Sequence, residues 1–459
     1  MDGERQKTQV ELALATESRG EAPKLNCEGT ESATAERDTE SLAEGQLREQ
    51  VCRRENLKRA LARVKRNKGS AGVDGMTVGE LSGYLKVPAI RERLLAGQYQ
   101  PLPVRRVEID KPGGKDKRKL GIPCVLDRFI QQALLQVLEP NFEPTFSEFS
   151  FGFRPGRSAH QAVALAQTYI AEGYLWVVDL DLEKFFDRVN HDILMGRVAK
   201  QVSDKRVLGL IRRYLQAGVL EQGLVEATYE GTPQWGPLSP MLSNILLTDL
   251  DRELERRGHR FVRYADDSNV YVKSEQAGQR VKASITRFLE TRLRLKVNEA
   301  KSAVAHPWQR KFLGFSFTRT PRPRRKIAPR ALARFKQRVG ELTARNQGRA
   351  LGEVIERLAL YLRGWRGYFG FCETRSVLRD LDSWIGHRLR SLVWKQWKRG
   401  RRRFAELVRR GVNRDLAAQT AGSPHGPWRL AKSPALHIAL PAAHFAALGL
   451  PRLHVSPTA

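Results

Sequence analysis

The sequence predicts an α+β fold that is followed by a mainly helical C-terminal part. Residues 174–182 form a short, β-branched and nearly all-apolar run, which is typical of a buried strand. Residues 259–273 indicate two further strands that meet at Asp266-Asp267. Beyond residue 330, apolar residues recur at helical spacing. We therefore expect a small antiparallel sheet with helices around it, and then a region made mostly of helices.

The other elements can be predicted in chain order. Apolar residues at helical spacing favour helices around residues 57–64, 129–138, 162–170 and 281–289, and three more at 332–342, 351–362 and 381–393. The helix at 129–138 should end before Pro140. Glycines in 69–75 indicate a loop, and residues 99–123 indicate a hairpin with a basic, glycine-rich tip.

Charge and composition narrow the function. The 459 residues contain 80 Lys+Arg and 50 Asp+Glu, a formal net charge of +30, and 41% hydrophobic residues exclude global disorder. Such a surplus of positive charge favours an anionic partner, with nucleic acid as the first candidate and a membrane surface as the alternative. No apolar run approaches 18 residues and no signal peptide is evident, so we expect a cytoplasmic protein without a membrane partner.

Two further features concern the cysteines and the N-terminus. The four cysteines are far apart and form no CxxC pair, so neither a zinc module nor a disulfide framework is indicated. Residues 1–50 contain 12 acidic and 6 basic residues and little apolar periodicity, and are predicted to be a disordered acidic leader.

A Pro- and Arg-rich segment at 319–330 is the predicted boundary before the helical part.

The candidate catalytic residues are carboxylates in an otherwise basic chain. Asp181 ends the predicted strand, and Asp266 and Asp267 lie at the turn of the predicted hairpin. Aspartate is common in turns for purely local reasons, and Asp179 and Asp187 flank Asp181, so the strand by itself singles out none of them. If the strand end meets the hairpin tip, these carboxylates could hold two Mg²⁺ ions for phosphoryl transfer.

Several sequence blocks resemble known ones. Asp-Leu-Glu-Lys-Phe-Phe-Asp (181–187), Gly-Thr-Pro-Gln-Trp-Gly-Pro-Leu-Ser-Pro (231–240) and Tyr-Ala-Asp-Asp (264–267) resemble successive palm blocks of a reverse transcriptase. Blocks at 119–123, 151–160, 189–191, 297–302 and 312–317 resemble those of bacterial group II intron-encoded reverse transcriptases, the maturases. Blocks at 361–369 and 394–398 resemble their maturase, or thumb, domain. The similarity covers about residues 50–450 and is closest to the shorter group IIC subclass without an endonuclease domain.

The resemblance implies a right-hand polymerase. The fingers with an N-terminal extension would span residues 51–172 and the palm 173–320, which together form a reverse transcriptase domain at 51–320. A helical thumb or maturase domain with a basic tail would follow at 321–459. Such a protein binds its group II intron RNA, assists splicing, and copies the intron into cDNA during retrohoming. Its cofactors would be two Mg²⁺ ions, and its partners the intron RNA, an RNA template with a DNA primer, dNTPs and target DNA.

The resemblance also implies roles for single residues. The spacing Asp-x-x-x-Phe-Phe assigns Asp181, with Asp266 and Asp267, as catalytic metal ligands, and Leu182 as a ligand through its backbone carbonyl. The implied nucleotide-binding residues are Lys111, Arg118, Phe186, Gln234 and Lys301. Phe186 would lie under the incoming sugar and exclude a 2′-hydroxyl, unless it only packs in the core, and Lys301 could be a plain solvated charge. Lys115 or Lys117 could take the place of Lys111. Trp235 departs from the usual Gln-Gly-Gly.

Basic residues with aromatic neighbours favour RNA binding, through phosphate neutralisation and base stacking. For each of them alone, a solvated charge or a core aromatic is the alternative. The predicted RNA-binding residues are Arg154, Arg157, Arg363, Trp365, Arg366, Tyr368, Trp394, Lys395, Lys398 and Arg399.

Three other functions compete with this interpretation. A non-catalytic RNA-splicing chaperone could keep the scaffold, although unpaired metal-binding carboxylates would then repel one another. A reverse transcriptase could instead serve in a retron, diversity-generating or defence role, which the C-terminal maturase-like blocks disfavour. An RNA polymerase is a weaker alternative.

Overall fold

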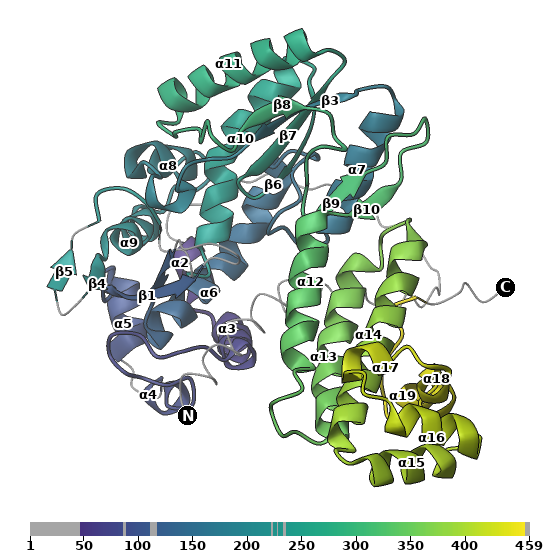
Figure 1. The fold of residues 1–459 in the computed structure, drawn as a ribbon. Coiled ribbons are helices and arrows are strands. Elements are labelled where there is room, and N and C mark those ends of the chain that lie inside the picture. The colour runs from purple at the N-terminus through teal and green to yellow at the C-terminus, as the bar shows by residue number, and fades with distance from the viewer. Residues whose placement is uncertain are drawn as a thin grey trace, which may run out of the picture. The chain divides into compact units, whose positions relative to one another are not determined.

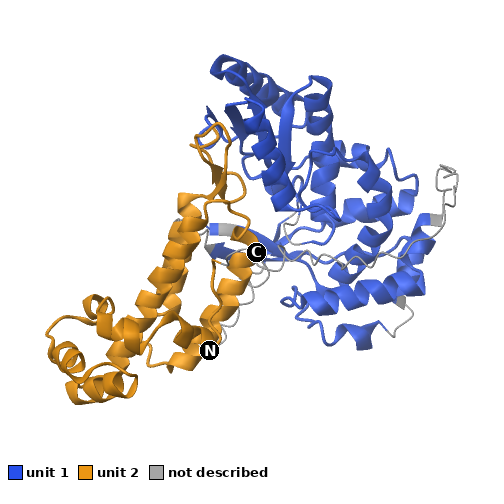
Figure 2. Ribbon diagram, turned by 90° about the vertical axis from the view of Figure 1, so that its right-hand side faces the viewer, with its two compact units in different colours: residues 1–306 blue, residues 307–459 orange. Residues whose placement is uncertain are grey.

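The computed structural model describes residues 46–85, 89–110, 117–221, 224–226, 228–232 and 236–454. The chain forms two compact units, residues 1–306 and 307–459, which are coloured separately in Figure 2. Most of the predicted acidic leader, residues 1–45, lies outside the described residues. Its last residues do not: helix α2 (Gln46–Val51) begins inside the predicted leader, and Leu47 is buried in the core of the first unit.

The first unit contains two four-stranded sheets surrounded by helices (Figure 1). Its strands are β1 (Val104–Asp110), β2 (Lys117–Ile122), β3 (Trp176–Leu180), β4 (Val219–Glu221), β5 (Leu224–Glu226), β6 (Arg260–Tyr264), β7 (Asp267–Val272) and β8 (Ala303–Ala305). Its helices are α2, α3 (Arg54–Asn67), α4 (Leu81–Tyr84), α5 (Ala89–Ala96), α6 (Val125–Phe142), α7 (Ala159–Ala171), α8 (His191–Val198), α9 (Lys205–Gln216), α10 (Ser239–Arg256) and α11 (Glu275–Arg292), with short 3₁₀ turns η1 (Glu143–Thr145) and η2 (Phe185–Asp187).

One sheet has the strand order β6-β7-β3-β8 and is entirely antiparallel. Its central strand β3 is the predicted buried strand, with Val177 and Val178 almost fully buried. Helix α11 packs against β3, β7 and β8, where Gly278 leaves room for Val304. Helices α7 and α10 pack against β6. The predicted strand at 174–182 and the predicted hairpin at 259–273 are therefore confirmed.

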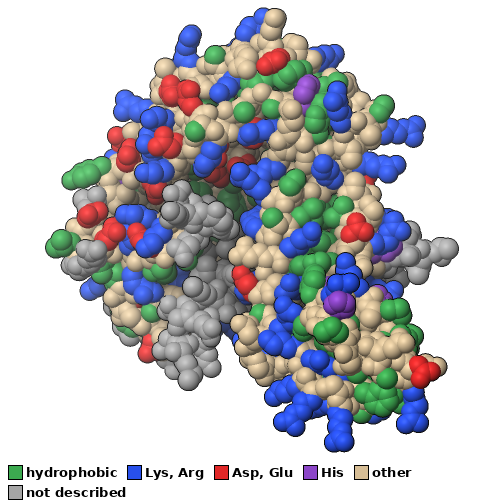
Figure 3. All heavy atoms as spheres, in the orientation of Figure 1, with side chains coloured by type: hydrophobic (Ala, Val, Ile, Leu, Met, Phe, Trp, Pro, Cys, Tyr) green, Lys and Arg blue, Asp and Glu red, His purple; other side chains and the backbone are tan. Residues whose placement is uncertain are grey.

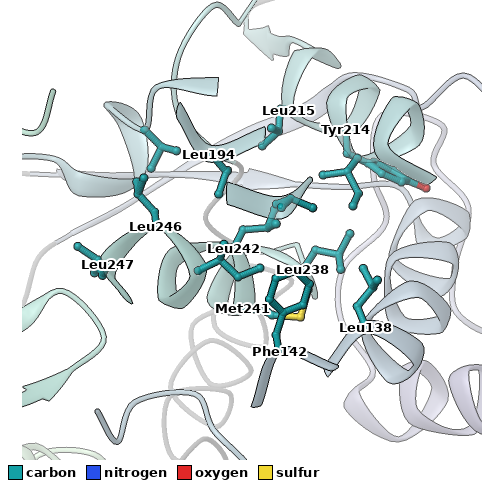
Figure 4. Close-up of a cluster of buried hydrophobic side chains, with 14 of the residues drawn as sticks. Leu138, Phe142, Leu194, Tyr214, Leu215, Leu238, Met241, Leu242, Leu246 and Leu247 are labelled. Carbon is teal, nitrogen blue, oxygen red and sulfur yellow. The ribbon is translucent and has the colours of Figure 1, made fainter. Parts of the chain in front are cut away.

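A single apolar core joins the helices of the first unit. Figure 4 shows side chains of α6, α8, α9 and α10 that converge, among them Leu138, Leu194, Leu215 and Leu242. Each of these leucines is at most 3% exposed. Because the core includes residues of the β3 sheet as well as these helices, the first unit folds around one shared core rather than two.

The other sheet has the order β2-β1-β4-β5, in which β1 and β2 form the predicted basic hairpin and β1 pairs with β4 in parallel. A buried carboxyl on α6 fixes the chain that leads into β1. Asp127 accepts a hydrogen bond of 2.8 Å from the Tyr99 hydroxyl and one of 3.3 Å from the Leu102 backbone amide. Burial raises the pKa of Asp127 to about 6.

Replacing Asp127 with asparagine is expected to change how stability depends on pH. An exposed aspartate titrates at about 3.9, so the folded state favours the neutral carboxyl. The stabilisation of the folded protein by the neutral Asp127 carboxyl is fully present below about pH 4 and is lost as the pH rises through about 6. Between these limits, the difference in unfolding free energy between wild type and variant should change by roughly 3 kcal/mol in urea titrations. A difference that stays constant with pH would contradict this account of Asp127.

The second unit is mainly helical, as predicted. A two-stranded sheet of β9 (Phe315–Phe317) and β10 (Arg325–Ile327) precedes its helices. The helices are α12 (Pro329–Leu342), α13 (Leu351–Phe369), α14 (Arg375–Gln396), α15 (Gly400–Arg409), α16 (Arg414–Gly422), α17 (Pro427–Leu430), α18 (Pro434–Ala439) and α19 (Ala442–Ala447). None of the helices within the described ranges is long and apolar enough to cross a membrane.

Two predicted limits differ from the structure. Helix α6 does not end before Pro140 but continues to Phe142. Pro140 costs the helix one backbone hydrogen bond, but Phe142 is only 2% exposed and holds the last turn in the core. The division between the units falls at 306/307 rather than at 320/321, because Phe315 of β9 packs on Phe369 of α13.

Candidate active site

The sheet register places the end of β3, with Asp181, beside the hairpin turn that carries Asp266 and Asp267. In the antiparallel pair of β3 and β7, Leu180 lies opposite Ser268. One step further along this register, Asp181 comes opposite Asp267, which is the first residue of β7 and pairs with Tyr264 across the hairpin turn. Asp179 lies opposite Asn269 instead, two residues further from the turn. The end of β3 and the tip of the β6–β7 hairpin therefore meet, and Asp181 is the carboxylate at that junction.

Backbone and side-chain contacts from the segment before β8 hold Asp181 in place. The Asp181 amide donates to the Ser302 hydroxyl at 2.9 Å, and the Asn298 amide donates to the Asp181 carbonyl at 2.8 Å. The Lys301 ammonium lies 3.7 Å from the Asp181 carboxylate. Lys301, a predicted nucleotide-binding residue, is thus beside the first catalytic aspartate, and its side chain is 63% exposed.

The turn that carries Asp266 and Asp267 has a constrained backbone. Ala265 has a φ of 57° whereas Asp266 has no positive φ, and a two-residue hairpin loop with a positive φ at its first central residue alone is a type II′ turn. Gly152, from the loop before α7, lies directly against this turn. A Cβ at position 152 would come within 2.3 Å of the Ala265 amide nitrogen, so only glycine fits there.

A buried ion pair supports the same turn, and this role was not predicted from the sequence. Arg263 and Asp251 are both fully buried and form two hydrogen bonds, of 2.7 and 2.6 Å. The remaining terminal nitrogen of Arg263 donates to the Asn244 amide oxygen and to the Ala265 carbonyl, each at 2.9 Å. Asn244 in turn donates to the Gly152 carbonyl at 2.9 Å. Arg263 thus ties helix α10 and the Gly152 loop to the turn.

A signal for this network is present in the sequence. Arg263 alternates with Phe261 along a short apolar strand, so the two side chains point to the same, buried face. A buried arginine requires an acidic partner. The sequence does not say which of many carboxylates that partner is, because Asp251 lies on a helix whose packing is set by the tertiary fold.

The turn that carries Phe186 contacts the chain segment before α10. The amide of Thr232 donates to the Phe186 carbonyl at 2.6 Å, and Gly231 approaches so closely that a Cβ there would lie 2.9 Å from the same oxygen. His191 donates from Nε2 to the Gly231 carbonyl at 2.6 Å, and burial lowers the pKa of its ring. Phe186 itself is half-buried and packs edge-on against Phe185, so part of its ring remains accessible.

Some predicted nucleotide-binding residues cannot be placed. Lys111 and Gln234, and with them Trp235 and the alternative Lys115, lie outside the described residues. Arg118 lies on β2 opposite Ile109, in the predicted hairpin, but its side chain is outside the described set. Lys117 pairs with Glu108 at 2.9 Å. Gly236 is described, and the side chain of Gln131 from α6 occupies the space that a Cβ there would need.

The donor set at the junction suits a hard divalent cation, because all of it is carboxylate oxygen. Asp181 and Asp266 are half-buried and Asp267 is exposed, so all three can be reached from solvent. Among the described residues there is no group of three or more Asp, Glu, His or Cys close enough to hold a metal ion as they stand. The carboxylates are neighbours, but they would have to converge further around a cation.

The structure corrects several predicted RNA contacts. Arg154 is 8% exposed and is fully engaged inside the protein, with Glu143 at 2.7 Å and with the backbone carbonyls of Ser147 and Ser150. Trp365 and Trp394 are core residues, 8% and 0% exposed, because large rings on packed helices bury best. Their predicted role in stacking on bases is therefore wrong.

The other predicted RNA contacts differ in how accessible they are. Tyr368 packs on Phe315 and donates from its hydroxyl to the Leu313 carbonyl at 2.8 Å. Arg157 is half-buried, with a bond of 3.0 Å to the Glu148 carbonyl. Most of the basic candidates remain at the surface, and Figure 3 shows many Lys and Arg side chains, with few acidic ones, over the second unit. Arg363, Lys395, Lys398 and Arg399 are exposed, and Arg366 is half-buried.

Comparisons with known proteins agree on one family. The family model "Reverse transcriptase (RNA-dependent DNA polymerase)" matches residues 109–317, and the model "Group II intron, maturase-specific domain" matches residues 332–411. Protein YkfC of Escherichia coli (strain K12) is 35% identical over 275 residues, which are 51% of this chain and 72% of that protein. The group II intron-encoded protein LtrA of Lactococcus lactis is 31% identical over 316 residues, covering 54% of this chain and 52% of LtrA.

The chain thus spans about half the length of LtrA. Among solved structures, a chain of a Cas6-RT-Cas1–Cas2 complex is 26% identical, with a TM-score of 0.36, over 53% of this chain and 42% of that chain.

Proposed function

This chain belongs to the group II intron-encoded reverse transcriptases with a maturase domain, and we propose that it copies RNA into DNA at the junction of Asp181 with the 266–267 turn. The fold is that of a right-hand polymerase followed by a helical maturase domain. One observation carries the proposal: the β3–β7 register, in which the continuation of β3 at residue 181 lies opposite residue 267. This register supports the proposal because it brings two proposed metal-ligand positions, far apart in sequence, to the same end of the sheet.

The chain's own residues account for binding and orientation. Asp181, Asp266 and Asp267, with the Leu182 carbonyl, would hold two divalent cations, which we propose to be Mg²⁺. Such a pair stabilises charge on the attacking and leaving oxygens of nucleotidyl transfer. Lys301 occupies a position beside the Asp181 carboxylate, where its ammonium neutralises that charge. Its long, exposed side chain can rotate toward solvent, which leaves Asp181 available to a cation or the lysine available to a triphosphate.

The second proposed activity is assistance to splicing of the intron RNA, followed by copying of that RNA during retrohoming. The matched maturase-specific domain at 332–411 supports it, together with the surplus of positive charge on this part of the chain. The proposed partners are the intron RNA, an RNA template with a DNA primer, dNTPs and target DNA. Phosphate contacts of this kind should give a steep dependence of affinity on salt concentration.

Primer extension tests the polymerase proposal. Purified protein should extend a DNA primer on an RNA template with dNTPs and Mg²⁺, and chelation by EDTA should stop synthesis. A protein that promotes splicing of its intron but makes no DNA under these conditions would be a splicing chaperone, the chief alternative. Synthesis without any effect on splicing would indicate a reverse transcriptase in another role.

Replacing Phe186 with alanine is expected to raise ribonucleotide incorporation relative to deoxyribonucleotide incorporation. The half-buried ring would lie under the incoming sugar, where a 2′-hydroxyl would collide with it. A steric block of this kind is worth a few kcal/mol, so discrimination should fall roughly 10²-fold.

Single-nucleotide incorporation of GTP and dGTP measures this ratio. Phe288→Ala, which shortens another partly buried phenylalanine of the first unit, is the matched control. An unchanged ratio in Phe186→Ala would leave the ring with a packing role only.

A further inference from the structure

We propose that a pocket in the second unit receives an unstacked nucleotide of single-stranded RNA, with its phosphates on arginines; this rests on the proposed function. The pocket has a volume of about 490 Å³ and is formed by the last turns of α13, the first turn of α14 and the segment 451–454. All of its walls belong to the same unit. Its size lies in the range of small-molecule sites and is sufficient for one nucleotide.

The rim of the pocket is strongly basic. Arg363, Arg366 and Arg375 line it, together with His454. Within the described part of the chain, none of the three arginines forms an ion pair with a carboxylate. Other arginines of this unit are paired, for example Arg357 with Glu353 on the same helix. Three guanidiniums without acidic partners around one hollow create a local positive potential that only an anionic ligand neutralises.

The start of α14 adds to this potential. The helix is 22 residues long, has no acidic residue in its first turn, and is not capped by the side chain of Thr374. The Thr374 hydroxyl is buried, and no described residue forms a hydrogen bond with it. The Val377 amide donates to the Thr374 carbonyl at 3.2 Å, but no acidic side chain of the first turn and no side-chain cap offsets the partial positive charge of the helix N-terminus. This partial positive charge favours phosphate binding at helix N-termini.

The floor of the pocket is apolar and its far wall is fixed. Leu378 and Leu453 line it and are 4% and 2% exposed. The Asp382 carboxylate accepts hydrogen bonds of 2.9 Å from the backbone amides of Leu453 and His454, which ties segment 451–454 to α14. Both Asp382 oxygens are thus already engaged. Glu373, two residues before α14, pairs with Arg325 at 3.4 Å. An apolar floor under a cationic rim matches a base with its phosphates.

Single-stranded RNA fits this combination better than a duplex. Proteins that read RNA specifically take up bases from loops and bulges, where nucleotides are already unstacked, and arginine planes contribute to stacking. A paired nucleotide would have to leave its helix first, at a cost of a few kcal/mol.

Two glycines of α13 allow a test that leaves every charge in place. Gly367 lines the pocket, whereas Gly364, one turn earlier, does not, and a Cβ at either position meets nothing within 4 Å. Gly367→Leu should fill the pocket, and Gly364→Leu is the matched control. We expect Gly367→Leu to weaken binding of a labelled 12-nucleotide single-stranded RNA about tenfold in fluorescence anisotropy, and Gly364→Leu to leave it unchanged. Equal affinities of the two variants would overturn the proposal.

A second pair of variants tests the charge. Arg375→Ala removes a pocket arginine and Arg379→Ala removes an exposed arginine one turn further along α14, outside the pocket. Arg375→Ala should weaken RNA binding several-fold more than Arg379→Ala at the same salt concentration. Equal losses would mean that only the overall charge matters, which contradicts the proposal.

Two further measurements distinguish an RNA pocket from a site for a free nucleotide and from a part of the polymerase site. Adenosine monophosphate at millimolar concentration should compete only weakly with the labelled RNA. If Gly367→Leu abolished binding of this nucleotide without affecting RNA binding, the pocket would serve a free nucleotide and the proposal would be wrong. Primer extension at saturating template tests the proposed polymerase function by itself. Gly367→Leu should retain it, so loss of RNA affinity in this variant and loss of polymerase activity are distinguishable.

Discussion

Replacing both Asp266 and Asp267 with alanine is expected to abolish RNA-templated DNA synthesis and to leave RNA affinity nearly unchanged. The turn lies opposite the end of β3, so these carboxylates and Asp181 share one junction. Cations held there stabilise the transition state by several kcal/mol, and each 1.4 kcal/mol is tenfold in rate, which predicts a loss of about 10³-fold or more. RNA affinity should persist because the proposed phosphate contacts lie on other residues.

The measurement is primer extension at saturating Mg²⁺, with RNA binding followed in parallel by fluorescence anisotropy. Asp192→Ala is the control, since its side chain is 80% exposed and lies on α8, outside the junction. Near-normal synthesis by the double variant would refute the assignment of the metal site. A parallel loss of RNA binding would instead indicate that the variant is misfolded or that the turn holds the template.

Replacing Asp251 with alanine is expected to destabilise the first unit by about 3–5 kcal/mol. The change leaves the Arg263 guanidinium buried without its carboxylate, and an unpaired buried charge is one of the most costly defects in a fold. The matched control is Asp249→Ala on the same helix. Asp249 also pairs with an arginine, Arg197, but both side chains are partly exposed, so that loss should cost less than about 1 kcal/mol.

Urea denaturation of the variants provides the measurement, and similar losses in Asp251→Ala and Asp249→Ala would contradict the prediction.

A third variant separates the effect of Arg263 on stability from its effect on the position of the turn. Asp251→Leu combined with Arg263→Met removes both buried charges and should recover most of the stability. It should still be slow in primer extension, because the hydrogen bond from Arg263 to the Ala265 carbonyl is lost and the turn is held less firmly. Full activity of this double variant would show that Arg263 stabilises the fold without positioning the turn.

Much of the fold is local enough to be predicted from the sequence. The strand at 174–182, the hairpin around Asp266 and the helices of the second unit follow from periodicities of two and of about 3.6 residues, which depend only on neighbouring residues. The parallel pairing of β1 with β4 could not be predicted in this way. It joins segments more than a hundred residues apart, and nothing in a three-residue strand specifies its partner.

The candidate site, like the fold, could be predicted from the sequence only in part. Family blocks predict Asp181 and the 266–267 turn as the site, and the β3–β7 register, continued by one residue, supports their proximity. The prediction that Trp365 and Trp394 stack on RNA bases did not hold because the sequence does not show how deeply an aromatic ring is buried. An aromatic residue beside basic residues is compatible both with a surface patch and with the buried face of a helix. Arg263 shows a different limit, because its alternation with Phe261 indicates a buried position but not the partner that compensates its charge. Only the tertiary fold identifies its partners, Asp251 and Asn244 on α10.

The contact of Gly152 with Ala265 limits how this enzyme can be redesigned. The loop before α7 closes the rear of the Tyr-Ala-Asp-Asp turn so tightly that a single added methyl group has no space. Laboratory selection for altered substrates therefore has little freedom at residue 152 and more at the exposed side chain of Lys301, which lies 3.7 Å from Asp181. Libraries for such selection should keep residue 152 fixed as glycine.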